Sequence, residues 1–236
     1  MLIDGFTLFG SWPGLPYDHP ADQLVNGVER YKLDRACIVS STGIFLDAAA
    51  GNQATWQASR QDPRLIPIGV ADPRLNGIEQ VNYCKEQGFR ILALFPVWQN
   101  WSVDNIAATR VLQRINELQM PVMVEAHREG DASAILRQTV DTTMPLILLD
   151  VSLTTLTEAI MAVQQRPNTY LATRLLCGGD TIEYLVETIG ADKLIFTSGF
   201  PINCFSSAYL TAKFASITDA QRSAILGGTI ARLFGW

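Results

Sequence analysis

Four residues of types that catalyse proton transfer or bind anions lie in three short apolar segments of this 236-residue sequence. Glu125 and His127 belong to the first segment, Asp150 to the second and Arg174 to the third. Two carboxylates in one poorly solvated pocket push each other's pKa apart, which gives one acid and one base. A histidine can carry the proton near neutral pH, and an arginine can hold a substrate carboxylate through two hydrogen bonds. The residues therefore predict a metal-free acid/base site with Glu125, His127 and Asp150 as catalytic groups and Arg174 as a substrate-binding group.

A second interpretation of the same residues is structural. Arg174 would then form an ion pair with Asp150 or Glu125, because an unpaired buried carboxylate costs several kcal/mol. His127, in a mostly apolar segment, would be an ordinary histidine with its hydrogen bonds satisfied. The sequence leaves both interpretations open.

The elements that must position these residues alternate along the whole chain. Short apolar runs such as 146–149 do not alternate with polar residues, as expected for parallel strands covered by helices. Eight strand-helix units of about thirty residues predict an α/β fold, a (β/α)8 TIM barrel forming a single domain over 1–236. A doubly wound sheet is the competing fold, but no GxGxxG follows the first strand. The expected strands are 2–8, 35–41, 65–72, 90–96, 121–127, 145–152, 169–174 and 193–199. The expected helices lie near 21–32, 46–61, 75–87, 104–119, 130–142, 155–165, 180–190, 203–216 and 219–234.

Function in a barrel of this type is expected at the carboxyl ends of the strands. Alternation along a strand predicts that Glu125 and His127 share a face, as do Asp150 and Ser152. Apolar residues reach the same end, where they either line an apolar ligand pocket or fill a disused cavity: Phe6, Leu8, Phe95, Trp98 and Trp101. The first loop after a strand could cover the opening or form a plain surface turn, with Trp12, Pro13, Pro16 and His19.

Helix starts carry recognisable capping patterns. Capping boxes are expected for the pairs Thr155 and Glu158, Asp180 and Glu183, and Thr218 and Gln221. The sequence Gly178-Gly179-Asp180 could hold an anion at a helix start. Asp180 would repel that anion, so we expect a glycine turn with an aspartate N-cap.

Composition excludes several classes of function. The net charge of −5 argues against nucleic acid as a partner, and only two histidines rule out a site built from three imidazoles. The four cysteines form no CxxC pair, which favours reduced thiols. No signal peptide or membrane-length apolar run is recognised, so a cytoplasmic protein is expected. No cofactor is expected.

Six segments of the sequence are motif-like and follow one another in order: 3–10, 88–96, 121–125, 146–150, 190–201 and 225–235. In these segments the chain resembles the amidohydrolase-related family of metal-dependent barrels. Residues 3–10 (IDGFTLFG) resemble that family's "IDGHTHFG" start, and 88–96 resemble its "GFxGIKLxP" strand. Residues 121–125 and 146–150 are similar to "PVLIH" and "IVLAH". The final segments are closest: 190–201 resemble "GADRILFGSDYP" and 225–235 resemble "ILGGNAARLFG".

The resemblance implies a metal-binding site at positions that carry other residues here. The family holds its metal with two histidines of the first strand, one histidine on each of the fifth and sixth strands, and an aspartate on the eighth. This sequence has, in that order, Phe6, Leu8, Glu125, Asp150 and Gly199. We therefore expect no metal site and no metal-activated water.

Two hypotheses follow. The first is a non-catalytic barrel that binds a small organic acid or a partner protein, such as a second copy or an active paralogue. The second is a metal-independent hydrolase or lyase acting on a small carboxylate or lactone.

Overall fold

A computed structural model describes residues 1–14 and 18–236 of the chain. Within them a nine-stranded sheet runs in the order β2-β1-β3-β4-β5-β6-β7-β8-β9. All neighbouring pairs from β1 to β9 are parallel, except that β2 (Asp18–His19) pairs antiparallel with the end of β1. The parallel strands are β1 (Ile3–Ser11), β3 (Arg35–Ser40), β4 (Leu65–Val70), β5 (Ile91–Leu94), β6 (Val122–Glu125), β7 (Leu146–Leu149), β8 (Thr169–Ala172) and β9 (Leu194–Ile195).

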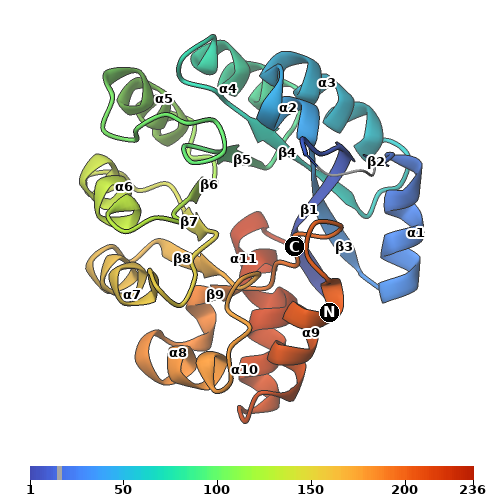
Figure 1. The fold of residues 1–236 in the computed structure, drawn as a ribbon, viewed down its shortest axis with the longest axis vertical. Coiled ribbons are helices and arrows are strands. Elements are labelled where there is room, and N and C mark those ends of the chain that lie inside the picture. Colours follow the sequence, from blue (N-terminus) through green and yellow to red (C-terminus); the bar gives the residue numbers. More distant parts are fainter. Residues whose placement is uncertain (15–17) are drawn as a thin grey trace.

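The sheet closes into a barrel through bonds between β1 and the segment after β9. The N–H of Gly5 donates to Phe196 O (2.9 Å), and the N–H of Gly199 donates to Phe6 O (2.9 Å). Viewed down the barrel, the helices follow one another around the strands in chain order (Figure 1). The predicted TIM barrel is therefore confirmed.

The helices form an outer layer around these strands. Between successive parallel strands lie α1 (Asp22–Tyr31), α2 (Ser41–Phe45), α3 (Ala48–Ser59), α4 (Gly77–Glu86), α5 (Ile106–Glu117), α6 (Asp131–Thr139), α7 (Leu156–Gln165) and α8 (Thr181–Ile189). A 3-10 turn (Ala191–Lys193) precedes β9, and α9 (Phe205–Phe214), α10 (Asp219–Ser223), a π-helix (Ala224–Gly228) and α11 (Thr229–Phe234) follow it. None of the described helices is long and apolar enough to cross a membrane.

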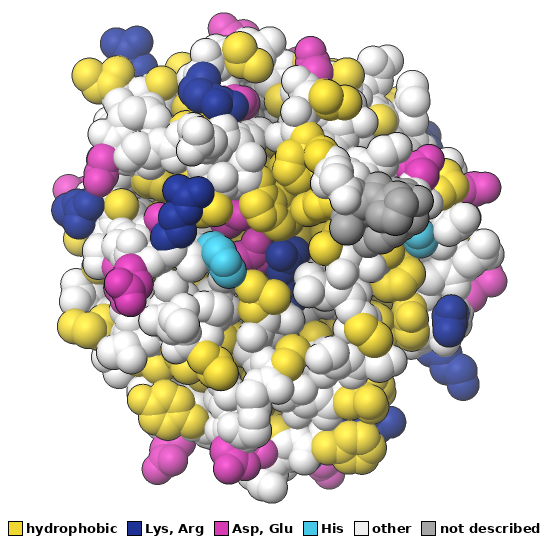
Figure 2. Space-filling view, viewed as in Figure 1, with side chains coloured by type: hydrophobic (Ala, Val, Ile, Leu, Met, Phe, Trp, Pro, Cys, Tyr) yellow, Lys and Arg dark blue, Asp and Glu magenta, His cyan; other side chains and the backbone are white. Residues whose placement is uncertain are grey.

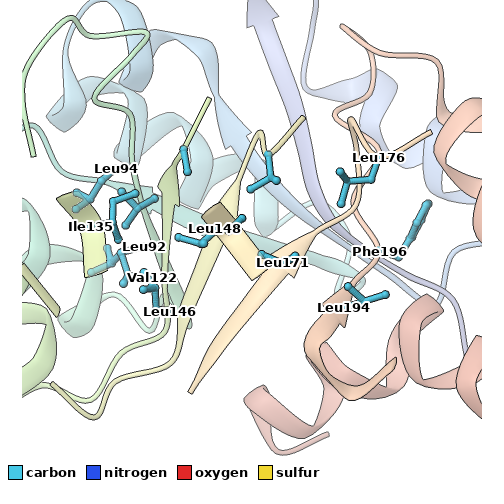
Figure 3. Packing of buried hydrophobic residues seen from close by; sticks show 14 of the residues in the cluster. Leu92, Leu94, Val122, Ile135, Leu146, Leu148, Leu171, Leu176, Leu194 and Phe196 are labelled. Atoms are coloured by element: carbon cyan, nitrogen blue, oxygen red, sulfur yellow. The ribbon is translucent and has the colours of Figure 1, made fainter. Parts of the chain in front are cut away.

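The parallel strands are buried on both faces over most of their length, because alternate side chains point to different cores. Val122 and Val124 pack in the layer between strands and helices, whereas Met123 belongs to the barrel interior. Figure 3 shows part of the outer layer, where leucines of neighbouring strands lie together and Ile135 of α6 packs beside Leu92 and Leu94. On β6, Glu125 follows Met123 on the interior side, so the strand itself aims this carboxylate into the barrel.

The N-terminal end of the barrel is closed by α11, which lies across the centre of Figure 1. Ile230 and Phe234 of this helix pack with the interior cluster, and Nη1 of Arg90, just before β5, donates to Phe234 O (2.9 Å). A site within the barrel is therefore reached from the opposite, C-terminal end.

The structure corrects several local predictions. The last strand is only two residues long, since residues 196–199 bond to β1 outside a regular ladder. Residues 41–45 form a separate short helix before α3. Of the three capping boxes, only that of Thr218 and Gln221 is present.

The other two capping predictions are wrong for different reasons. The hydroxyl of Thr155 accepts from Ser152 N (3.1 Å), while Glu158 accepts from Gly130 N and Ser133 N at the start of the preceding helix. Asp180 has a left-handed backbone (φ 56°) and caps nothing with its side chain.

Candidate functional site

An arginine-aspartate ion pair lies at the C-terminal end of the barrel. Nε of Arg174 is 2.6 Å from Oδ1 of Asp150, and the two side chains are only 6% and 2% exposed. The backbone N–H of Arg174 donates to Thr197 Oγ1 (3.0 Å), and Thr197 N donates to Thr173 Oγ1. These paired threonines join the ends of β8 and β9, and they fix the point from which Arg174 extends into the barrel.

The backbone of Asp150 departs from the strand that precedes it. Leu149 packs in the barrel interior, so simple alternation would turn the next side chain outward. Asp150 instead has a φ of +63°, an uncommon left-handed conformation for a non-glycine residue. This conformation lets two successive side chains face the interior, and it brings the carboxylate to Arg174.

Glu125 is fully buried and held by backbone donors from the loop after β5. Its Oε2 accepts from Val97 N (2.7 Å) and Trp98 N (2.9 Å). Burial, assisted by the nearby charge of Asp150, raises the pKa of Glu125 to about 8, although the two N–H groups and Arg174 oppose the shift. Glu125 is therefore protonated at neutral pH, and since Oε2 accepts two bonds, the proton is placed on Oε1.

Burial also raises the pKa of Asp150, against the favourable charges of Arg174 and His127. Several polar atoms of the cluster lack hydrogen-bond partners among the described residues. They are Oε1 of Glu125, Oδ1 of Asp150, and Nε and Nη1 of Arg174. The close contact of Arg174 with Asp150 is thus an ion pair without hydrogen-bond geometry. Buried groups of this kind are ordinarily satisfied by protein, water or a ligand.

Aromatic rings enclose the guanidinium. The central carbon of Arg174 lies 5.4 Å from the ring centre of Phe6 and 5.3 Å from that of Trp98, distances at which a cation is attracted to the ring faces. Trp98 stacks on Phe95 and meets Trp12 edge to face. Figure 2 shows acidic, basic and histidine side chains together in a hollow at the centre of this face, bordered by hydrophobic groups.

Not all predicted site residues join this cluster. His127 is exposed at the rim, where Nδ1 is 3.2 Å from the backbone oxygen of Asp150 rather than its carboxylate. The expected pairing of faces also fails for Ser152, whose hydroxyl contacts Thr154 Oγ1 (2.8 Å) outside the site. Leu8 lies in the barrel interior.

The residues that follow β1 do not all lie at the barrel mouth. Trp12 reaches the barrel mouth through Trp98, as a cover would, whereas His19 packs against Phe200 away from it. Pro16 lies outside the described residues.

The sequence analysis missed a further buried carboxylate, Asp4. It accepts from Phe6 N (3.1 Å), from Ser198 N (2.9 Å) and from the Ser198 hydroxyl. Burial raises the pKa of Asp4 to about 6 despite these bonds. Asp4 thus links β1 to the segment after β9 and helps close the barrel. The only sequence signal was an aspartate within an apolar strand.

The position of Gly199 has a direct relation to the cluster. A Cβ on this residue would lie 3.0 Å from Nη1 of Arg174 and 2.8 Å from Oδ1 of Asn203. Across residues 1–14 and 18–236, no group of three histidine, cysteine or acidic side chains is arranged to hold a metal ion.

A family model described as amidohydrolase matches residues 10–236, nearly the whole chain. The chain belongs to the amidohydrolase family. No curated protein matches it.

Solved structures with the same fold have little sequence identity to this amidohydrolase-family chain. A probable 2-pyrone-4,6-dicarboxylic acid hydrolase from Acinetobacter baumannii with citric acid bound has a TM-score of 0.78 at 15% identity, covering 100% of this chain and 99% of its own. A 2,6-dihydroxybenzoate decarboxylase from Rhizobium has a TM-score of 0.80 at 13% identity, with the same coverage. For 5-carboxyvanillate decarboxylase from Sphingomonas paucimobilis the TM-score is 0.75 at 13% identity, covering 99% and 98%. At these identities the likeness establishes the fold alone.

Proposed function

We propose that this chain is a metal-independent member of the amidohydrolase family that binds a small organic acid at the C-terminal end of its barrel. The observation that carries the proposal is the buried guanidinium of Arg174, enclosed by Phe6 and Trp98, with Nη1 unpaired. A carboxylate is the natural acceptor for such a group. Several structural relatives are named as hydrolases or decarboxylases of carboxylic acids, which supports a small carboxylic acid as the ligand.

The residues at the family's metal positions do not fit a divalent cation. Phe6 and Leu8 supply no donor atom, and Oε2 of Glu125 already accepts two backbone N–H groups. Asp150 is paired with the guanidinium of Arg174, which would repel a metal ion held by the same carboxylate. A permanent cation of the protein thus balances the charge of Asp150, and no step of the proposed function involves a metal.

Glu125 supplies the second contact to the acid. With its proton on Oε1, it can donate to one oxygen of a carboxylate while Arg174 donates to the other. The ligand then pairs two buried groups that have no partner among the described residues, and such groups are costly to leave unpaired.

Binding of small acids tests the proposal directly. Isothermal titration calorimetry in the presence of EDTA would measure binding of benzoate and citrate to the unmodified chain. In Arg174→Lys a single ammonium group replaces the planar guanidinium and its two parallel N–H donors. The affinity for benzoate and citrate should then fall about tenfold to hundredfold. Arg137→Gln alters an exposed arginine paired with Asp104 on the outer surface and should leave affinity unchanged. No binding to the unmodified chain, or equal binding by Arg174→Lys, contradicts the proposal.

A catalytic version of this site is the second candidate, a metal-independent hydrolase or lyase acting on a carboxylate or lactone. The observation that favours it is the raised pKa of Glu125, about 8, which suits a general acid at neutral pH. Glu125→Gln keeps the acceptor for Val97 N and Trp98 N but has no transferable proton. Turnover should then disappear while binding of the acid is retained. Turnover that survives this change excludes Glu125 as the acid.

A further inference from the structure

The loop after β5 forms a turn over residues 96–100 at the C-terminal end of the barrel. The N–H groups of Val97 and Trp98 lie at the start of this turn, as free donors do at the start of a helix. Both groups donate to Oε2 of Glu125. The position of the turn therefore determines how Glu125 is held.

The side chain of Gln99 connects this turn to α2. Gln99 is only 9% exposed. Its Nε2 donates to the carbonyl of Ile44 (3.0 Å), and its Oε1 accepts from the indole N–H of Trp101 (2.9 Å). Ile44 belongs to the last turn of α2, where carbonyls have no partner within the helix. Gln99 thus gives a donor to α2 and an acceptor to the far end of its own loop.

These bonds give the amide of Gln99 one orientation. A glutamine amide carries its donor and its acceptor on one planar group, and a buried amide is costly to leave without partners. The backbone N–H of Gln99 also donates to Phe95 O (2.9 Å), at the first residue after β5. The main chain and the side chain of one residue therefore fix the turn to β5 and to α2.

The same connection holds Trp98 beside Arg174. Phe45 follows the carbonyl acceptor in α2, and its ring stacks on Trp98 with ring centres 5.9 Å apart. The ring centre of Trp98 lies 5.3 Å from the central carbon of Arg174. The bond from Gln99 to α2 therefore fixes the backbone that places Phe45 against the ring of Trp98.

We propose that Gln99 is a positioning residue of the acid-binding site. It fixes the turn to α2 and so keeps the N–H groups of Val97 and Trp98 on Glu125, with Oε1 of this carboxyl group left for the ligand. Among the described residues, the side chain of Gln99 bonds to neither Glu125 nor Arg174. Its effect on ligand binding rests on the proposed function, whereas its effect on Glu125 exists without a ligand.

Amide NMR signals of the full chain report the contact with Glu125 directly. The signal of an N–H that donates to a carboxyl group shifts when that group ionises, because the bond becomes shorter and stronger. The pKa of Glu125 is about 8, and the charges that act on it are those of Asp150 and Arg174. The amide protons of Val97 and Trp98 should therefore shift together as the pH rises through 8. Glu125→Gln should abolish this shift.

Gln99→Met removes both side-chain bonds and keeps an unbranched side chain of similar length. The two amide shifts should then be largely lost. The affinity for benzoate, measured by calorimetry, should fall at least about tenfold because Glu125 is no longer held in one orientation. Trp101→Phe removes one of the two bonds and keeps an aromatic ring, so its amide shifts should be intermediate. This milder variant tests the same connection without depending on the stability of Gln99→Met.

Gln138→Met is the matched control. The side chain of Gln138 also makes two side-chain bonds, with Thr109 and Asp104, but it does so between α6 and the start of α5. Its amide shifts and its benzoate affinity should equal those of the unmodified chain.

Two results overturn the proposal. One is that the amide signals of Val97 and Trp98 do not titrate in the unmodified chain. The other is that they titrate unchanged in Gln99→Met or, if that variant does not fold, in Trp101→Phe. A failure of benzoate to bind the unmodified chain contradicts the proposed function instead, and the amide shifts still decide whether Gln99 holds the turn on Glu125.

Discussion

The guanidinium of Arg174 lies against Gly199, at the position where the family resemblance implies an aspartate. A Cβ at residue 199 would approach Nη1 of Arg174 to 3.0 Å and Oδ1 of Asn203 to 2.8 Å, so an aspartate at this position would require these side chains to move. The missing side chain at Gly199 therefore leaves room for the long side chain of Arg174. Together they place a positive charge at the mouth of the barrel.

Substitution of Gly199 tests this close approach. Gly199 has a φ of +67°, and Gly130 a similar φ of +89° with nothing within 4 Å of an added Cβ. Gly130→Ala should lose about 1–2 kcal/mol of unfolding free energy from its backbone alone. Gly199→Ala should lose about 1–2 kcal/mol more, because its methyl group meets Arg174 and Asn203. Urea unfolding of both variants measures the difference, and equal losses would show that the space beside Gly199 is open.

Removal of only one of the two charges in the ion pair of Arg174 and Asp150 should lower the free energy of unfolding. Asp150→Asn leaves the buried guanidinium without a counter-charge, and we expect a loss of about 3–5 kcal/mol. The double variant Asp150→Asn with Arg174→Met removes both charges and should be more stable than Asp150→Asn alone. Thermal and urea unfolding check the order, and a double variant less stable than the single one contradicts the pairing.

Carboxylate binding should depend on the protonation of Glu125. Its pKa of about 8 keeps the proton on Oε1 below that pH, so affinity is full near pH 6 and is lost as the pH rises through 8. Glu125→Gln donates an N–H at every pH, and its affinity should be nearly constant from pH 6 to 9.5. Calorimetry at several pH values tests this, and a parallel loss in the variant would assign the titration to another group.

Asp4 should make the fold less stable as the pH rises. Its pKa of about 6, against an ordinary 3.8, means that the folded chain binds more protons than the unfolded chain between these values. Deprotonation of Asp4 should therefore lower the free energy of unfolding by about 2–3 kcal/mol between pH 3.8 and a pH above 6. In Asp4→Asn, Oδ1 can still accept from Phe6 N and Ser198 N, and Nδ2 can donate to the Ser198 hydroxyl.

The measurement is the unfolding free energy of both proteins at pH 4.5 and pH 7. The unmodified chain should lose more stability than Asp4→Asn over this interval. The same slope in both proteins would show that Asp4 does not titrate in this range.

Much of the fold could be predicted because apolar runs and amphipathic helices record burial directly. Val122-Met123-Val124, for example, is apolar on both faces and is buried on both. The first residues of the helices were harder to predict. Thr155 and Asp180 have the residue types of N-caps, but the hydroxyl of Thr155 accepts from Ser152 N in the preceding turn, and Asp180 has a left-handed backbone.

The site was partly predictable for a similar reason. Regular alternation places Glu125 and Arg174 inside the barrel, whereas Asp150 reaches it through a positive φ that no sequence pattern records. The two N–H groups on Glu125 come from a loop whose path depends on the whole fold. Asp4 was missed because its partner Ser198 is 194 residues away along the chain.

The central claim is that Arg174, rather than a metal ion, balances the charge of Asp150 at the barrel mouth. Its most direct test is the metal content, by mass spectrometry, of protein purified without chelator from medium supplemented with zinc and manganese. The account predicts far less than one metal ion per chain. One equivalent of either metal, lost in a Glu125→Gln or Asp150→Asn variant, would contradict it and would mean that these carboxylates form a metal site.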